Sequence, residues 1–458
     1  MIRLKKLWVV VLLFSLTFFL VQIFFLKHVS KQGHKLKQKS DINHRHGFEQ
    51  EVFQYNSIKE YLELCQNLKL PTFLIDPAIL DHIMGNVTIS EECKHLCLNR
   101  PVTVFGATGE EVFDWEQVQH SFSKAGYEVV KTSESDPRLL SVDSLATSQI
   151  TTHMLLHKAG SYIHLVIFYE RSGGFLWHGS LPWDSLLHTK EYPVFMSMQD
   201  HIEYGPRAGA YDKFERVPVN IDGIKFHAPK YPTLLVNQIP HSRFLECNHT
   251  RAKTFYSLHG RDGSTDAMAF KKAAVDLLSR AKKCLDELNI RFWLSSGTCL
   301  GWFRQCDIIP YSKDVDIGIW IKDYDIRLTP AMHMSGMPLI HLFGKESDSF
   351  EMSFRGGDVK LDVFFFYEEG DTMWNGGTQA RTGNKYKYIF PKFSLCWTEF
   401  QEMKVRVPCE TQSYVEANYG KEWFTPVKHW DWKKSPPNVY PNGQWPEDER
   451  DEVIRLFP

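Results

Sequence analysis

An uncharged apolar run near the N-terminus constrains this chain more than any other feature. Residues 7–26 have the sequence LWVVVLLFSLTFFLVQIFFL, without a single charged side chain. At a rise of about 1.5 Å per residue, a helix of this length crosses the hydrocarbon core of a bilayer. Arg3, Lys5 and Lys6 precede the run, and no small-residue cleavage site follows it. We therefore predict a short cytosolic tail at 1–6 and an uncleaved transmembrane signal-anchor at 7–26, rather than a buried soluble helix or a removed signal peptide.

Two sequons favour a lumenal body after this anchor. Asn86 and Asn248 each begin an Asn-x-Ser/Thr triplet, the acceptor for N-glycosylation in the secretory pathway. Basic residues lie on both sides of the run, so the positive-inside rule does not decide the orientation. The modest length of the run suits the thinner membranes of the early secretory pathway. These observations predict a single-pass membrane protein with a lumenal C-terminal body.

The rest of the chain has the composition of a large globular protein. It has 458 residues, of which 43% are hydrophobic, and this is enough for two folded domains. The formal net charge of −2 provides no basic field, which argues against a nucleic-acid partner. The nine cysteines allow up to four disulfides in an oxidising lumen. Cys396 and Cys409 flank a predicted strand pair and could form a bridge, whereas Cys93 and Cys97 lack a second pair of zinc ligands at suitable spacing.

Changes in composition divide the chain after the anchor into three segments. Residues 27–46 are polar and Lys-rich, which indicates a flexible stalk. Residues 47–262 alternate strand-like and helix-like stretches and predict an α/β stem domain; its predicted strands lie at 72–76, 101–106, 126–132 and 162–170, with a helix at 114–126. We find no catalytic constellation in this segment.

Residues 263–458 predict a second domain with a mixed sheet. Ser264 or Thr265 can cap a helix with apolar residues at helical spacing, and residues 349–370 predict a hairpin that turns at Gly356-Gly357-Asp358. A helix at 410–420 ends at Gly420, and a Pro-rich tail is expected to form an extended strap. The expected fold class of the whole is α/β (α+β).

The clearest chemical signal is an Asp-x-Asp pair at the start of an apolar strand. Asp314 and Asp316 lie in PYSKDVDIGIW, residues 310–320. Side chains two apart on a strand share one face, so both carboxylates are expected to point the same way. Like charges held this close are costly unless a cation lies between them. The pair therefore predicts a cation site at the mouth of a buried strand.

Two further segments belong with this pair. Asp362 lies in the apolar run VKLDVFFFY, where an unpartnered carboxylate would be unstable. Three carboxylates on adjacent strands form the hard-oxygen site that Mg²⁺ or Mn²⁺ prefers. Upstream, a turn between a strand and a helix start offers hydroxyls and close backbone approach, which favour an anionic phosphate; its residues are Ser295, Ser296, Gly297 and Thr298.

Simpler explanations exist for each element. Asp362 could pair with Lys360 or Arg355, and the Asp-x-Asp pair could cap a strand. The chain contains a second such pair, Asp323 and Asp325, at a polar junction where capping a helix is the expected role. The elements occur in the order strand, Ser-Gly turn, helix, Asp-x-Asp and strand Asp. This combination is stronger evidence for a functional site than any one of its elements.

These segments resemble a known family. SSGTCLGWFRQCDIIPYSKDVDIG at 295–318, together with KLDVFFFY at 360–367, is similar to the LicD-type nucleotidyltransferase-like family. The predicted anchor, WNGGTQARTG at 374–383 and WDWKKSPPNVYPNG at 430–443 narrow the resemblance to one branch of that family, over essentially the whole chain.

The resemblance implies an enzyme of the Golgi membrane with a lumenal catalytic domain. It implies transfer of ribitol 5-phosphate from CDP-ribitol to an O-mannosyl glycan of α-dystroglycan, with other O-mannosyl glycan-modifying enzymes as partners. Asp314, Asp316 and Asp362 fall on the family's metal-site carboxylates, and Gly297 falls on its Gly-Ser-type turn. Relatives often carry a further acidic residue two positions before Asp314, where this chain has Ser312. The departure puts an additional metal contact from this loop in doubt.

Other side chains are weaker candidates for substrate contact. Basic residues could bind phosphate or glycan and tryptophans could stack on a sugar or base, but a solvated loop or core packing explains them equally well or better; they are Arg381, Lys385, Lys387, Trp374 and Trp430, with His429 alongside. The general base is not identified by the sequence, and Asp362 or another carboxylate could serve.

Two rival functions remain open at this point. An Asp-x-Asp glycosyltransferase would use the same carboxylates to hold a nucleotide sugar and would transfer the sugar itself. A catalytically silent scaffold for glycan-modifying enzymes would tolerate the loss of Asp316.

Overall fold

The computed structural model describes residues 55–83, 95–96, 102–112, 114–140, 148–183, 194–195, 198 and 201–458. The predicted tail, anchor and stalk, and the sequon at Asn86, lie outside these residues. Within the described ranges, no helix combines the length and the apolar character needed to cross a membrane.

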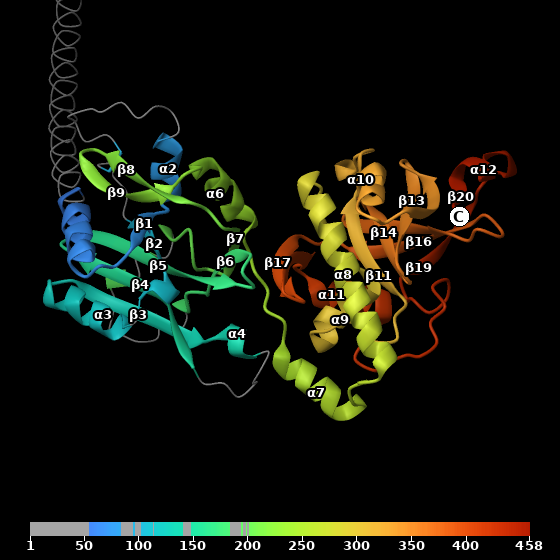
Figure 1. Cartoon of the computed structure of the whole chain (residues 1–458), viewed down its shortest axis with the longest axis horizontal. Helices are drawn as coiled ribbons and strands as arrows, with labels where there is room; N and C mark the ends of the chain where they lie inside the picture. Colours follow the sequence, from blue (N-terminus) through green and yellow to red (C-terminus); the bar gives the residue numbers. More distant parts are fainter. Residues whose placement is uncertain are drawn as a thin grey trace, which may run out of the picture.

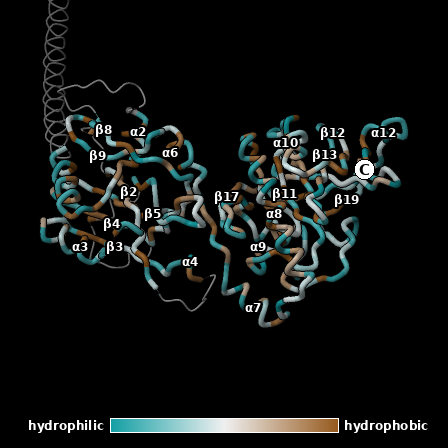
Figure 2. The backbone as a smooth tube through the Cα atoms, in the orientation of Figure 1, coloured by the Kyte–Doolittle hydropathy of each residue, from teal (hydrophilic) through white to brown (hydrophobic). Residues whose placement is uncertain are grey.

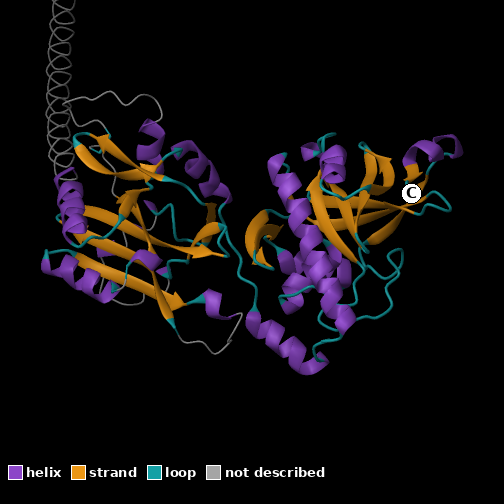
Figure 3. Cartoon of the chain, viewed as in Figure 1, coloured by secondary structure: helices purple, strands orange, loops and turns teal. Residues whose placement is uncertain are grey.

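The described chain folds into an N-terminal and a C-terminal unit, each built on a mixed sheet (Figures 1 and 3). Each has its own apolar core, one drawn from residues between Ile58 and Phe244 and the other from residues between Cys247 and Val415. Figure 2 shows hydrophobic residues along β2 and along α8, inside the two units. The predicted mixture of sheets and helices is confirmed, while the predicted boundary at 262/263 stays a prediction.

The N-terminal sheet has the strand order β3-β4-β5-β2-β1-β9-β8, with β6 pairing with β5 and β7. Its strands are β1 (Thr72–Leu74), β2 (Val102–Thr108), β3 (Glu128–Ser135), β4 (Gln149–Lys158), β5 (Ser161–Arg171), β6 (Phe175–His178), β7 (Gly209–Asp212), β8 (Arg216–Ile221) and β9 (Ile224–Pro229). Pairs β2–β5 and β1–β9 are parallel and the others are antiparallel. All four predicted strands of this segment are present.

Short helices surround this sheet: α2 (Pro77–Ile83), α3 (Trp115–Lys124), α4 (Pro137–Leu140), α6 (Pro232–Gln238), and the 3-10 turns η1 (Gly109–Glu111) and η3 (Ile239–His241). Helix α3 begins where the Asp114 carboxylate accepts the Gln117 N–H, which is an ordinary N-cap. Helix α7 (His249–His259) leads to the C-terminal unit and is capped by Asn248, the second predicted sequon residue.

The C-terminal sheet has the order β19-β16-β15-β14-β13-β12-β20, and β11 joins β14 to β10. Its strands are β10 (Phe292–Leu294), β11 (Asp314–Trp320), β12 (Leu339–Lys345), β13 (Asp348–Gly356), β14 (Val359–Glu369), β15 (Thr372–Thr378), β16 (Asn384–Pro391), β19 (Val439–Gln444) and β20 (Ile454–Leu456). The predicted hairpin is β13–β14. The Pro-rich tail is partly a strap, but it also adds β19 and β20 at the two ends of the sheet order.

Helices cover one face of this sheet and close the end near β11. Helix α8 (Thr265–Glu287) starts at Ser264, whose hydroxyl accepts the Ala267 N–H, and it crosses β11 and β14 in Figure 1. The other helical elements are α9 (Ser296–Gln305), η4 (Ile321–Asp323), α10 (Leu328–Met334), α11 (Thr411–Tyr419), η5 (Glu447–Glu449) and α12 (Arg450–Val453). The predicted helix end at Gly420 is confirmed, with a φ of 75° at that residue.

The units meet at the two-stranded sheet β17 (Leu395–Phe400) and β18 (Met403–Pro408). The buried Arg171 guanidinium lies 2.6 Å from the Glu246 carboxylate and 2.7 Å from that of Glu399. The bridge between Cys396 and Cys409, which the sequence suggested, is present in the same region. A second bridge, Cys247–Cys306, was not predicted.

Candidate active site

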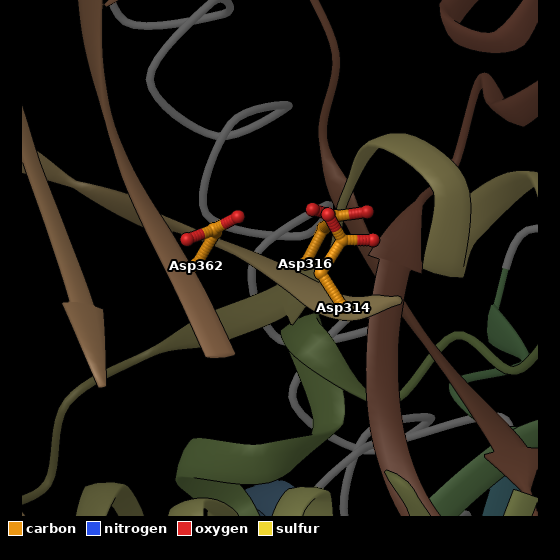
Figure 4. Close-up of side chains that lie close together, drawn as sticks. All are labelled: Asp314, Asp316 and Asp362. Atoms are coloured by element: carbon orange, nitrogen blue, oxygen red, sulfur yellow. The ribbon is translucent and has the colours of Figure 1, made fainter. Parts of the chain in front are cut away.

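The three predicted carboxylates converge on one face of the C-terminal sheet. Asp314 and Asp316 begin β11, and Asp362 lies on β14, which pairs with β11 in parallel. In the register of this pair Asp316 is directly opposite Asp362. One oxygen of each of the three carboxylates lies within 4.8 Å of the others, and Figure 4 shows the side chains rising on the same side of the two ribbons.

Strand alternation explains this convergence. On β11 the apolar side chains Val315, Ile317 and Ile319 are buried in the core, so the aspartates between them face the other side of the sheet. The same alternation on β14 sends Leu361 and Val363 to the core and turns Asp362 toward Asp316. A core face that is fixed by apolar burial therefore fixes the direction of the acidic face.

The predicted turn at 295–298 holds Asp316 from behind. The Gly297 N–H donates to Asp316 Oδ2 over 2.9 Å, and the Asp316 N–H donates to Thr298 Oγ1 over 2.8 Å. A Cβ at Gly297 would lie 3.1 Å from Asp316 Oδ2, so glycine permits the close approach. Ser296 has a φ of +38°, which costs a non-glycine residue conformational energy.

The hydroxyls of this turn divide into internal and accessible ones. Ser295 is fully buried and its hydroxyl lies 2.8 Å from that of Tyr414, while the Thr298 hydroxyl is engaged with Asp316. Ser296 and Gly297 line the cavity described below. The phosphate-binding role predicted for the four residues stays a prediction, and Ser296 with Gly297 are the two members placed to fulfil it.

Polar neighbours hold the other two carboxylates. Lys360 Nζ lies 2.7 Å from Asp362 Oδ2, and the Ser353 hydroxyl donates to Asp362 Oδ1 over 2.6 Å. Asp362 therefore does pair with Lys360, as the simpler explanation expected, and it also belongs to the cluster of three carboxylates. Ser312, which stands where relatives often have an acidic residue, donates to Asp314 Oδ1 over 2.8 Å.

The three carboxylates are buried more deeply than their few cationic neighbours can compensate. Asp316 is 5% exposed and Asp362 is 4% exposed. Burial raises the pKa of Asp316 well above its usual range, and the charges of Asp314 and Asp362 raise it further. Burial also raises the pKa of Asp362, against the lowering effect of Lys360. A single lysine does not offset three carboxylates, and an all-oxygen donor set of this kind fits Mg²⁺ or Mn²⁺.

A cavity of about 640 Å³ opens in front of the cluster. Its floor is the acidic face of β11, β13 and β14, and one wall is the segment between α11 and β19, which includes Trp430 and Trp432. These two tryptophans are 40% and 38% exposed. A volume of this size accommodates a small organic ligand and not only an ion.

Most of the weaker candidates are engaged elsewhere. Lys385 forms an ion pair with Asp348 at 2.6 Å, Lys387 pairs with Glu369, and Trp374 stacks on Tyr367 at 4.3 Å. Arg381 is exposed. None of these four residues, nor His429, lines the cavity, whereas Trp430 does; core packing is therefore the wrong explanation for Trp430.

Several cavity residues were missed from the sequence. Glu351 and Ser353 alternate with buried residues of β13 and face the cavity. The sequence FEMSF shows the alternation, but that Glu351 and Ser353 face the three aspartates follows only from the pairing of β13 with β14. Tyr388 and Tyr419 come from β16 and α11, and no local pattern marks them.

The second Asp-x-Asp pair lies elsewhere and is differently used. Asp323 pairs with Arg291 at 2.9 Å, and the Asp325 carboxylate accepts the Arg327 N–H over 2.8 Å just before α10. The expected capping role holds for Asp325 in part, since Arg327 and not Asp325 occupies the N-cap position.

Comparison with known proteins agrees with this geometry. A family model described as "Fukutin N-terminal" matches residues 1–275, and one described as "LicD/FKTN/FKRP, nucleotidyltransferase domain" matches residues 289–410. Similar proteins include "Ribitol-5-phosphate transferase FKTN" of Homo sapiens, 47% identical, and that of Mus musculus, 46% identical, each over 98% of both chains. The chain belongs to the fukutin family. The predicted resemblance is thereby confirmed at the level of the family.

The LicD segment at 289–410 contains the Ser-Gly turn and all three carboxylates, whereas the cavity wall that includes Trp430 and Trp432 lies outside it. "Ribitol 5-phosphate transferase FKRP" of Homo sapiens is 46% identical over 39 residues, which is 8% of each chain. Its similarity is therefore confined to a short segment.

Proposed function

We propose that the chain is a metal-dependent phosphotransferase that moves ribitol 5-phosphate from CDP-ribitol to an O-mannosyl glycan of α-dystroglycan. The carrying observation is the convergence of Asp314, Asp316 and Asp362 on the floor of a ligand-sized cavity. The printed name of its full-length fukutin relatives, ribitol-5-phosphate transferase, supports the reaction.

The three carboxylates would hold Mg²⁺ or Mn²⁺. When bound, such an ion offsets the charge of a pyrophosphate and of the departing nucleotide. Gly297 and Thr298 keep Asp316 in place through their hydrogen bonds, and Lys360 keeps a fixed positive charge beside Asp362. The Ser296 hydroxyl, at the start of α9 and at the cavity, would donate to a phosphate oxygen.

The cavity then orients the acceptor hydroxyl for in-line attack on the phosphorus that bears ribitol. The bond from this hydroxyl oxygen to phosphorus forms as the bond to the CMP oxygen breaks, and the hydroxyl proton passes to a carboxylate or to solvent. Trp430 and Trp432 line the cavity, and an acceptor bound against them would displace water that could otherwise compete with it.

The cellular setting follows from the sequence. We propose a single-pass type II protein of the Golgi membrane with residues 27–458 lumenal, N-glycosylated at Asn86 and Asn248. The N-terminal unit would dock other O-mannosyl glycan-modifying enzymes or position the acceptor.

The test is a transfer assay with full-length protein in detergent. The protein is incubated with Mg²⁺, an O-mannosyl glycopeptide of α-dystroglycan and either CDP-ribitol or UDP-sugars, and the product is weighed by mass spectrometry. We expect a gain of one ribitol phosphate with CDP-ribitol alone, and loss of this gain when EDTA removes the metal. A gain of only a hexose would contradict the proposal and favour the glycosyltransferase.

A further inference from the structure

The cavity floor continues one row of side chains beyond the carboxylates. The strand register places Asp316, Asp362, Ser353 and His341 side by side across β11, β14, β13 and β12. Two residues further along these strands, the next row on the same face contains Phe364, Glu351 and Phe343. All three line the cavity. A carboxyl group thus lies between two aromatic rings, one row from the proposed metal ligands.

Glu351 differs from the other carboxylates of the floor. Asp316 accepts a backbone N–H, Asp314 accepts a serine hydroxyl, and Asp362 has both a serine and a lysine. Among the described residues, the half-buried Glu351 carboxyl has neither a hydrogen bond nor an ion pair assigned to it. A carboxyl group so placed is costly unless a ligand or water supplies the missing hydrogen bonds.

Two further aromatic side chains, Tyr388 and Trp432, line the same cavity as Glu351. Burial and then the Glu351 charge raise the pKa of Tyr388, so the two groups lie within electrostatic range of each other. The Tyr388 hydroxyl donates to the Trp432 carbonyl over 2.7 Å. A Cβ at Gly377 would lie 3.1 Å from the Trp432 ring and 3.3 Å from that of Tyr388, so the glycine lets both rings approach the sheet.

A carboxyl group surrounded by aromatic rings favours some parts of a nucleotide-linked substrate over others. A carboxylate repels phosphate, whereas hydroxyl groups donate to it readily. Aromatic faces pack against the C–H groups of a polyol chain or sugar ring. Glu351 lies two residues from Ser353, the partner of Asp362, which is about 7 Å along an extended strand. A carbon chain attached to a metal-bound phosphate can span this distance. A nucleobase lies farther from that phosphate, because a second phosphate and a ribose separate them.

We propose that Glu351, with Phe343, Phe364, Tyr388 and Trp432, forms a subsite that binds a neutral polyhydroxylated group, with Glu351 determining specificity. The inference rests on the proposed function, which supplies two such groups, the ribitol of the donor and the sugar of the acceptor.

The test compares Glu351→Gln with a matched control, Glu346→Gln, which changes an exposed carboxylate outside the cavity. Binding of CDP-ribitol and of CDP is measured with full-length protein and Mg²⁺, together with KM for donor and acceptor. We expect Glu351→Gln to raise one KM by about 10- to 100-fold, as expected for a lost hydroxyl contact, while CDP binding changes less than about twofold. Glu346→Gln should change neither KM nor CDP binding.

The arms of the experiment identify the ligand. A higher KM for CDP-ribitol together with weaker CDP-ribitol binding assigns the subsite to the donor ribitol, and a higher KM for the acceptor alone assigns it to the acceptor sugar. A parallel loss of CDP affinity would mean that Glu351 recognises the nucleotide, and unchanged KM values would mean that it binds no substrate; both overturn the proposal.

Failure of the proposed function is detected separately, because it appears as absence of ribitol phosphate transfer by the unmodified protein. The binding comparison between CDP-ribitol and CDP does not need turnover. Glu351→Asp, which keeps the carboxyl but shortens it, should restore part of the lost affinity, and a thermal unfolding scan checks that each variant folds.

Discussion

Two buried polar clusters, one in each unit, differ in what completes them. The C-terminal unit has a cluster of three carboxylates at the floor of a cavity, and the N-terminal unit has a cluster of three histidines, His153, His164 and His178, which are 0–1% exposed. The carboxylates repel one another and face an open volume. The histidines contact each other and the backbone, and they do not line the cavity in front of the carboxylates.

Hydrogen bonds nearly complete the histidine cluster from within. The Gly179 carbonyl accepts from His153 Nε2 over 2.9 Å and from His178 Nδ1 over 2.8 Å. The bare His153 Nδ1 then accepts from His164 Nε2 over 3.0 Å. This arrangement needs neutral rings. A polar cluster that satisfies itself is structural, whereas one that needs an external cation and faces a cavity is a candidate for chemistry.

The largest expected effect comes from Asp316→Asn. The change keeps the size of the side chain but removes one charge from the cluster, and we expect ribitol phosphate transfer to fall by about 10³-fold or more. The metal-free protein should be no less stable, because like-charge repulsion at a buried site is relieved. The transfer assay and thermal unfolding in EDTA measure both effects. Unchanged glycan modification in cells would favour the scaffold function instead.

Lowering the pH should destabilise the N-terminal unit through its histidine cluster. Burial, with the neighbouring rings, lowers the pKa of His153 to about 3, and burial lowers that of His178 to about 4. The unfolded chain, with His near 6.5, binds more protons than the folded one below that pH, so stability is lost as pH falls through 6.5 toward 4. For His178 the loss between pH 7 and pH 4 is about 3 kcal/mol.

Hydrogen exchange of β4 and β5 amides at pH 7, 6 and 5 reports this unit separately from the C-terminal one. We expect the free energy of local opening to fall with pH, and His178→Gln to reduce the slope. An identical slope in the variant would show that His178 does not titrate in this range.

Much of the site follows from local pattern, and the remainder depends on pairing. Alternation of Asp314 and Asp316 with apolar residues, and the isolated charge at Asp362, are visible in the sequence because a buried face dictates the opposite face. The parallel register that sets Asp316 opposite Asp362 is not visible in the sequence, because the two residues are 46 positions apart and are brought together only when their strands pair. Glu351 reaches the cavity through the pairing of β13 with β14, and Trp432 through the fold of the segment between α11 and β19; neither is visible in a local pattern.

Glu134 should show a pH dependence of the opposite sign within the N-terminal unit. Burial, followed by the charges of Glu246 and Asp136, raises its pKa to about 7, and its Oε1 is buried without an assigned hydrogen-bond partner among the described residues. The folded state binds the extra proton between pH 4.5 and 7, so stability falls as pH rises through that window. Glu134→Gln should therefore stabilise the unit at pH 8 by about 1–2 kcal/mol and have little effect at pH 4.5. Chemical unfolding at the two pH values measures this difference, and equal effects at both would contradict it.

The smallest expected effect is that of Asp323→Asn, which separates an Asp-x-Asp sequence from an Asp-x-Asp site. Asp323 loses only an ion pair with Arg291, whose side chain is 50% exposed, and pairs of this kind contribute about 0.2–1 kcal/mol. We expect no change in transfer activity and a shift of at most a degree or two in the unfolding temperature. Asp323 shares its spacing with Asp314 and Asp316 but has a cationic partner and faces no third carboxylate. A loss of activity comparable to that of Asp316→Asn would mean that convergence of three carboxylates on a cavity is not what distinguishes the catalytic pair.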